Sequence, residues 1–209
     1  MERIVTPGRA REIMGGRLVG AEELAACPIL DLQAIREVPP IPFSEQELKR
    51  LKEDYLLVLG TDRFRSGEPV TIRNLKKRFG IDPDKSEPCF YNQDWYDHES
   101  FIDLPMPCGW QLIRERVFED SRAVSPEILL GQGRLFPSAI TCTYAFFAAW
   151  FCLGKRLWEH DFVWCADTDH NGDRIYVGKY HDIDGINKNG FSVHRHLALR
   201  PCYGAINSY

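Results

Sequence analysis

The chain has 209 residues and a formal net charge of -4 at pH 7, and 44% of its residues are hydrophobic and 27% charged. This length can bury a full core without disulfides, and the composition excludes an intrinsically disordered chain. A slightly acidic chain lacks the basic footprint of most nucleic-acid-binding proteins, so we expect no nucleic-acid partner.

The seven cysteines are odd in number, and no two of them form a CxxC pair. This argues against a zinc ribbon and against a disulfide framework. The first residues, MERIVTPGRAREIMGG, carry charges where an export signal needs an apolar core. We therefore expect reduced thiols in the cytoplasm.

The first third of the chain predicts helices. Thr6-Pro7 is a helix start, and AEELAA at 21–26 is a second short helix. A proline-rich segment, 37–43, then joins this helical subregion, 1–36, to the rest. We expect the whole chain, 1–209, to form a single domain.

The middle of the chain predicts mixed structure. Ser44 and Glu47 form a capping box for a helix that leads into the strand YLLVLG at 55–60. TIRNLKKRFG at 71–80 predicts a further helix. Within CFYNQDWYDHESFID at 89–103 we expect an amphipathic helix capped by Asn92 or Asp94, and the alternative is a pair of catalytic carboxylates of the kind that glycoside hydrolysis uses. WQLIRERVF at 110–118 predicts a strand.

The C-terminal part predicts one long helix followed by strands. The apolar run Ala139–Leu153 has 15 residues, fewer than the roughly 20 that cross a bilayer, so we expect a buried helix over about 137–155 and no membrane partner. The expected strands are FVWCAD, RIYVGKY and FSVHRHLAL, with YGAI as a fourth candidate. The fold class is therefore α+β, with N-terminal helices and the long helix packed on a mainly antiparallel C-terminal sheet.

Short blocks along most of the chain resemble a family of bacterial hypothetical proteins that has no assigned activity. The blocks are AREIMGGRLVGAEEL, IPFSEQELKRLKEDYLLVLG, WYDHESF, GWQLIR and GDRIYVGKYHDIDG. The resemblance implies a bacterial, cytosolic protein that folds as one unit. It assigns no catalytic or binding residue.

The stretch DTDHNGDRIYVG, 167–178, begins like a calcium-binding EF-hand loop. The candidate calcium ligands are Asp167, Asp169 and Asn171. Gly172 has the required sixth position, but Gly178 stands where a bidentate glutamate is needed. The missing ligand and the β-rich flanks favour a hairpin with its turn at Asn171-Gly172 over a calcium site.

A two-residue turn at that point fixes the pairing of the hairpin. Asp169 would face Arg174 across the strands as an ordinary ion pair. Alternation of side chains would then place one apolar face on the core. The residues of that face would be Phe162, Trp164, Ala166, Ile175 and Val177.

A histidine cluster in the C-terminal sheet is the candidate metal site. His194 and His196 lie two residues apart on a predicted strand, so both side chains would point to one face and could share a divalent transition metal. His181, with Asp182 or Asp184, could complete the site. The alternative is that Phe191, Val193, Leu197 and Leu199 point inward and leave the histidines in water.

Two neighbouring segments of opposite charge form the candidate interaction surface. Residues 61–80 carry six basic and two acidic side chains, and 81–103 carry seven acidic and one basic. The surface residues are Arg73, Lys76, Lys77, Arg78, Trp95 and Tyr96. The basic helix could also neutralise the acidic segment within the fold, or bind single-stranded nucleic acid together with an aromatic residue.

The leading hypothesis from sequence is a non-enzymatic cytosolic protein, without a cofactor, that binds another protein or itself. The first alternative is a metal-dependent hydrolase acting on a phosphoester through the histidine cluster. The second is single-stranded nucleic-acid binding through the basic 61–80 region.

Overall fold

The computed structural model describes residues 4–186, 188–195, 198–207 and 209. The α-helices are α1 (Pro7–Met14), α2 (Ala21–Ala25), α3 (Glu45–Leu51), α4 (Ile72–Phe79), α5 (Pro126–Gly131) and α6 (Ala139–Leu153). The strands are β1 (Leu18–Val19), β2 (Tyr55–Gly60), β3 (Gly109–Arg114), β4 (Phe162–Thr168), β5 (Arg174–Gly178), β6 (Ser192–His194) and β7 (Tyr203–Gly204). The 3-10 helices are η1 (Gly15–Arg17), η2 (Pro28–Leu30), η3 (Ser100–Asp103) and η4 (Glu119–Ser121).

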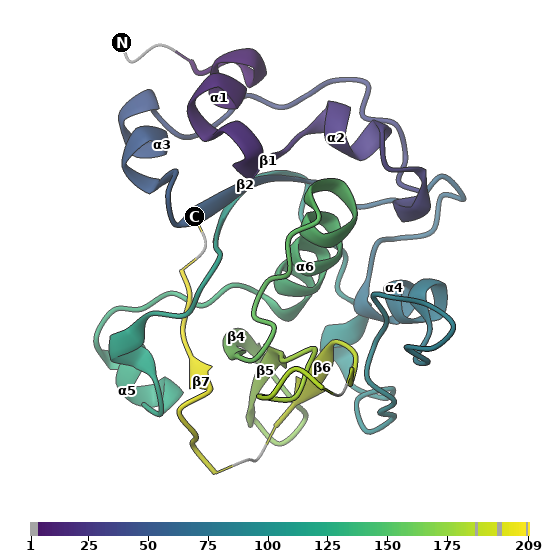
Figure 1. Ribbon diagram of the computed structural model, residues 1–209, viewed down its shortest axis with the longest axis vertical. Coiled ribbons are helices and arrows are strands. Elements are labelled where there is room, and N and C mark those ends of the chain that lie inside the picture. The colour runs from purple at the N-terminus through teal and green to yellow at the C-terminus, as the bar shows by residue number, and fades with distance from the viewer. Residues whose placement is uncertain (1–3, 187, 196–197, 208) are drawn as a thin grey trace.

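The strands form two sheets with α6 between them (Figure 1). The N-terminal sheet has the order β1-β2-β3, with β1 parallel and β3 antiparallel to β2. The C-terminal sheet has the order β6-β5-β4-β7, in which β5 is antiparallel to both neighbours and β7 is parallel to β4. The α+β class is confirmed, and the N-terminal sheet adds a second layer on the far side of α6.

Helix α6 is the centre of the core because it is apolar on every side. Its first eleven residues are all buried, and it contacts both sheets. Ser138 caps its first turn by accepting from the Thr141 N–H, and the Asp167 carboxylate accepts from the Ala139 N–H at 2.6 Å. None of the described helices is long and apolar enough to cross a bilayer.

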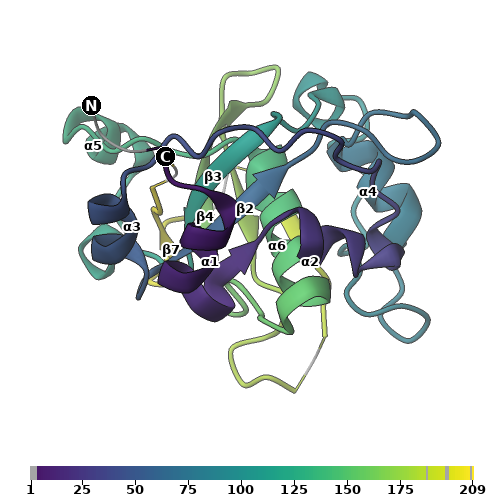
Figure 2. The same cartoon turned by 90° about the horizontal axis from the view of Figure 1, so that it is seen from above.

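The N-terminal helices form where their capping residues predict them. Thr6, Ser44 and Thr71 each accept a hydrogen bond from a first-turn N–H of α1, α3 and α4. Helices α1 and α3 pack on each other at the outer end of the N-terminal sheet, as the view from above shows (Figure 2). The helices expected in this part of the chain are confirmed.

The amphipathic helix expected over 89–103 is wrong. The described chain there forms turns, and only Ser100–Asp103 is a short 3-10 helix. The segment uses its backbone for other partners, because the Tyr91 N–H donates to the Phe191 carbonyl and the Gln93 carbonyl accepts from Lys76. Tertiary contacts have replaced the helical hydrogen bonds here.

The hairpin of β4 and β5 is confirmed, but the expected pairing is wrong. Trp164 stands opposite Tyr176 and Thr168 opposite Arg174, with an irregularity between these two pairs. The cause is a longer loop, in which the Asp169 carboxylate accepts from the N–H groups of Asn171 and Asp173 at 2.9 and 2.8 Å.

The expected pair of Asp169 with Arg174 is therefore also wrong. Asp169 forms its ion pair with Arg195, whereas the Arg174 guanidinium donates to the Ala166 carbonyl at 2.5 Å. The longer loop moves the two side chains out of register with each other.

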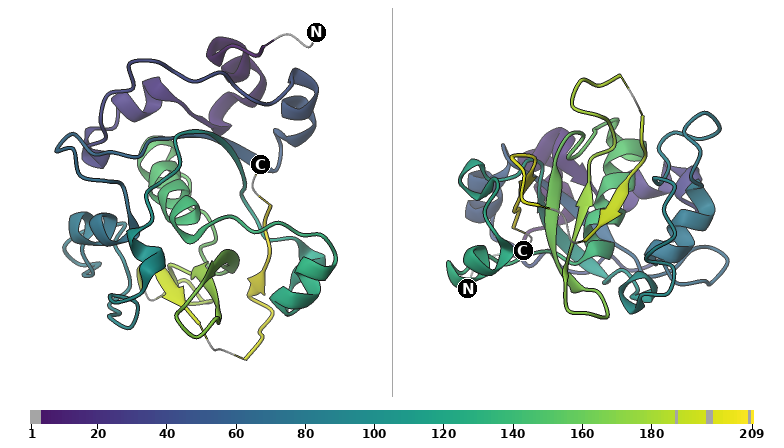
Figure 3. Two further views of the ribbon diagram at one scale, coloured as in Figure 1. Left: turned by 180° about the vertical axis from the view of Figure 1, so that it is seen from behind. Right: turned by 90° about the horizontal axis from the view of Figure 1, so that it is seen from below.

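Both faces of the C-terminal sheet are apolar and covered, whereas the sequence predicted only one apolar face. Ile175 and Val177 join the main core against α6, whereas Phe162, Trp164 and Tyr176 belong to a second cluster with Leu129 of α5 and Tyr203. Figure 3 shows α5 beside β7 at the rim of this second face. Ala166 lies in neither cluster and is exposed.

The last expected strand is shorter than FSVHRHLAL, since β6 covers only Ser192–His194. Phe191 and Val193 are buried in the main core as expected, but Leu199 is exposed because the chain has left the sheet. Leu197, the other residue expected to point inward, lies outside the described residues.

Candidate functional site

The second face of the C-terminal sheet is hollowed at one end, and we call this hollow the His194 pocket. Its volume is about 300 Å³. It is lined by Tyr91, Phe162, Lys179, Asp182, Asn189, Ser192 and His194. Gly178 stands opposite Phe162 on one side and opposite Ser192 on the other, and it adds no side chain between them. The central strand, β5, therefore contributes no side chain between Phe162 and Ser192, and this leaves space for the pocket.

His194 is held in its neutral form. Its ring lies 5.2 Å from the Phe162 ring and stacks on the Tyr176 ring at 6.0 Å. Burial among these rings and, to a lesser extent, the nearby Lys179 ammonium lower the pKa of His194 to about 4. At neutral pH the imidazole therefore has one donor and one acceptor nitrogen.

Lys179 enters the pocket from a strained backbone. Its φ of 45° is in the left-handed region, which costs a non-glycine residue roughly 1–2 kcal/mol. The Lys179 N–H donates to the carbonyls of Trp158 and Asp161 at 3.0 and 2.8 Å, and these bonds fix the strained turn. Its ammonium forms no ion pair with any residue that the structure describes.

Gly178 and Gly190 are the two places where the pocket requires glycine. A Cβ at Gly178 would lie 2.4 Å from the Asp161 carbonyl oxygen, and one at Gly190 would lie 2.5 Å from the Phe90 carbonyl. Both φ values are also positive, at 130° and 86°. The backbone around the pocket is closely packed, so its shape is set by the fold.

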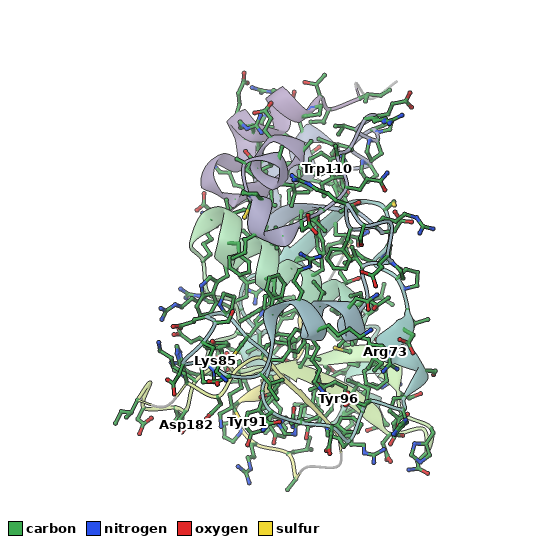
Figure 4. All side chains as sticks on the ribbon, turned by 90° about the vertical axis from the view of Figure 1, so that its right-hand side faces the viewer. Arg73, Lys85, Tyr91, Tyr96, Trp110 and Asp182 are labelled. Carbon is green, nitrogen blue, oxygen red and sulfur yellow. The ribbon has the colours of Figure 1, made fainter. Side chains whose placement is uncertain are left out.

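The loop between β5 and β6 forms one wall. Asn189 donates from its side chain to the Asp182 carboxylate at 2.6 Å and from its backbone to the Tyr180 carbonyl at 2.8 Å. The ammonium of Lys188 pairs with Glu87. Tyr91 and Asp182 lie near each other at the same end of the molecule (Figure 4).

The expected histidine metal site is only partly described, and its described members have separate partners. His181 is buried, and its Nδ1 lies 2.6 Å from the Glu159 carboxylate. His194 lies in the pocket, and His196 is outside the described residues. Asp184 accepts from the Ile186 N–H at 3.2 Å. Within the described chain, His181 and His194 belong to no group of ligand atoms close enough to hold one ion.

The expected calcium ligands point to different parts of the fold. Asp167 binds the start of α6, whereas Asp169 binds its own loop and Arg195. Burial raises the pKa of Asp167. The stretch resembles a calcium loop in sequence, but the carboxylates of Asp167 and Asp169 serve the fold.

One group of potential metal ligands was not found from the sequence. Glu99, Asp169 and His170 offer ligand atoms within 4.8 Å of one another. The Arg195 guanidinium already contacts both carboxylates and lies 4.5 Å from the Trp95 ring centroid. Because the Arg195 guanidinium contacts both carboxylates, we interpret this group as an ionic link between three segments of the chain.

The expected interaction surface is largely used inside the fold. Arg73 pairs with Asp103 at 2.6 Å, Lys76 with Asp97 at 2.9 Å, and Arg78 with Asp31 at 2.8 Å. Figure 4 shows Arg73 and Tyr96 on this side of the molecule.

The aromatic members of that surface are also held inside. Tyr96 is fully buried under Lys76, so its place on an exposed surface is wrong. Trp95 is half-buried and donates to the Val193 carbonyl at 3.0 Å. Lys77 and Arg78 are the exposed members of the set, and the alternative of neutralisation within the fold describes the geometry best.

Two other hollows can be compared with the His194 pocket by their lining residues and the ion pairs of these residues. The hollow around Trp158 is larger, about 440 Å³, but its Lys155 and Arg156 pair with Glu115 and Glu159. The hollow beside the exposed Cys108 has about 220 Å³ and is lined mainly by the chain over 33–39. Arg116 in the first of these hollows and Arg36 in the second have no ion pair among the described residues either, so the His194 pocket differs from both by its neutral imidazole beside a lysine.

Sequence reasoning identified His194 and Asp182 but not Lys179 or Tyr91. Gly178 indicates a backbone position with positive φ, but no sequence pattern predicts that the backbone of Lys179 is also in the left-handed region. Tyr91 comes from a segment about one hundred residues earlier, and only the tertiary fold brings it to the sheet.

No protein-family model matches the chain, and comparison with curated proteins and with solved structures returned no match. The resemblance to a bacterial family stays a prediction, and the pocket is interpreted from its own chemistry.

Proposed function

We propose that the protein is a non-enzymatic binding protein that holds a small molecule in the His194 pocket. The observation that carries the proposal is Lys179, which lines the pocket from a strained backbone and forms no ion pair with any residue in the described part of the chain. Strained backbone that the surrounding fold maintains is concentrated at functional sites. The aromatic wall and the few polar groups are typical of small-molecule pockets.

Binding without catalysis is supported by how the buried hydroxyl is placed. Ser192 donates to the Gly190 carbonyl at 3.3 Å. Within the described chain no hydrogen bond links it to His194, so the imidazole is not arranged to activate it as a nucleophile.

The other functions expected from sequence have less support. The described histidines do not meet at one point, and most cations of the basic 61–80 region have partners inside the fold. We propose the cytoplasm as the location, which is supported by seven free thiols that a reducing compartment would maintain.

A fragment screen by NMR tests the proposal. We expect fragments that bind to shift the signals of Ser192, His194 and Lys179, and to bind more weakly to the variant Tyr91→Ala, which loses an exposed wall of the pocket. Tyr209→Ala is the matched control, because Tyr209 is an exposed aromatic residue that contacts Tyr55 in the other sheet. Shifts that gather elsewhere, or equal losses in both variants, would contradict the proposed site.

A further inference from the structure

The Lys179 ammonium at the His194 pocket has no ion pair among the described residues. Lys179 is the cation of its described lining, and no described carboxylate holds it in an ion pair. Asp182, the acid of the same lining, already accepts from Asn189 at 2.6 Å. In the hollow around Trp158, Lys155 has its acid partner at 3.0 Å, and Arg116 is the lining cation without an ion pair among the described residues.

The remaining polar groups suit an anion that also accepts neutral hydrogen bonds. His194 is uncharged, and because its ring accepts from the Gln93 side-chain nitrogen at 3.3 Å, one ring N–H is left as a donor. Asn189 and Ser192 also line the pocket. A carboxylate or phosphate would give the ammonium its missing partner, and a charge-assisted hydrogen bond of this kind is among the stronger ones.

The apolar part of the lining suits a flat ring. Phe162 is perpendicular to the His194 ring, at 86°, and the Tyr91 ring lies 6.5 Å from it on a separate segment. Tyr91 is partly exposed, so one aromatic face at the mouth is open to a ligand.

Building on the proposed function, we infer that the ligand of the His194 pocket is a small anion, a carboxylate or a phosphate carried on an aromatic ring, and that Lys179 binds its charge. The strained turn serves this contact, because it directs a long cationic side chain from the end of β5 toward the pocket. Glycine would fit the same backbone without strain.

Four probes test the inference by titration calorimetry and NMR: benzoate, phenyl phosphate, benzamide and phenol. We expect the two anions to bind at least about tenfold more tightly than the two neutral compounds, and to weaken as salt is added. Comparing benzoate with phenyl phosphate identifies which of the two anions the pocket prefers.

Variants of the lysine separate charge from shape. We expect Lys179→Met to weaken anion binding by about tenfold or more, Lys179→Arg to retain most of it, and Lys52→Met, at an exposed lysine remote in sequence, to change nothing. Lys179→Gly should abolish the preference for anions while keeping or raising the melting temperature, because it removes the strained residue. Ala123→Gly is the control for strain alone, since Ala123 has a φ of 57° outside the pocket.

The outcomes distinguish the two proposals. Neutral and anionic probes that bind the pocket equally, with Lys179→Met unchanged, would overturn the anionic ligand and leave small-molecule binding in place. Anions that bind with shifts away from Ser192 and His194 would overturn both.

Discussion

His194 is an imidazole whose surroundings disfavour its proton. In the folded chain its pKa falls from 6.5 to about 4, mainly because of burial and also because of Lys179. The unfolded chain therefore binds a proton at this site at a higher pH than the folded chain does. Stability from His194 is fully present above pH 6.5 and decreases as pH falls toward 4.

This linkage predicts that the unfolding free energy varies with pH because of His194. When the pH is lowered from 7 to 5, His194 should decrease the unfolding free energy of the wild type by about 2 kcal/mol. The variant His194→Asn should not show this decrease. Urea unfolding at the two pH values measures it. His98→Asn, at an exposed histidine, should keep the wild-type dependence. Equal pH dependence in wild type and His194→Asn would show that the folded imidazole is not buried as described.

At the scale of elements, α4 and the acidic segment after it neutralise each other. Lys76 shows this most clearly, since its ammonium reaches Asp97 at 2.9 Å and the Gln93 carbonyl and lies 4.4 Å from the Tyr96 ring centroid. The neighbouring Lys77 is on the exposed side of the same helix. Consecutive residues of one helix thus have different roles.

The two lysines form a matched pair for mutation. Lys76→Met should lower the unfolding free energy by roughly 1–3 kcal/mol, because it leaves half-buried acceptors without their donor. Lys77→Met should change it by less than about 0.5 kcal/mol. Chemical denaturation of both variants measures the difference. Equal small effects would mean that the pairs of α4 are solvated and that this helix is available to a partner.

The helices of this protein could be predicted because their signals are local. Thr6, Ser44 and Thr71 act on backbone groups three residues away, and the α6 run is apolar throughout. The chain over 89–103 has equally good helical spacing, but its carbonyls and N–H groups bond to α4 and to Phe191. Those partners are far away in sequence, so periodicity alone could not show the difference.

In the candidate site too, local features could be predicted from the sequence and long-range contacts could not. His194 could be singled out as a metal ligand candidate, but its neutral state depends on Phe162 and Tyr176, which pairing of three strands brings to it. The register of those strands was not predictable, because Asp169 lengthens the turn by bonding to two N–H groups of its own loop. A two-residue turn is only the default for Asn-Gly.

At the scale of the whole molecule, α6 joins both sheets in one core. The main hydrophobic cluster includes Leu57 of the N-terminal sheet and Val177 of the C-terminal sheet. Phe147 of α6 stacks on Phe79 at 4.5 Å and contacts Phe191 at 6.1 Å. The chain also returns to the first sheet, where Tyr209 and Leu112 exchange backbone hydrogen bonds at 2.9 and 3.2 Å. The main core is therefore shared by the two sheets, and the C-terminal sheet has the second cluster in addition.

This shared core predicts that the two sheets unfold together. Native-state hydrogen exchange should give the same opening free energy for buried amides of β2 and β5, and Phe147→Leu should lower both by the same amount, about 1 kcal/mol. Leu129→Ala is the contrasting variant, since Leu129 of α5 belongs to the second cluster, which contains no residue of the N-terminal sheet. In a single cooperative unit it too lowers both values equally. If Leu129→Ala lowers only the opening free energy of the β5 amides, the C-terminal sheet opens separately. The His194 pocket would then belong to a part of the fold that can unfold by itself.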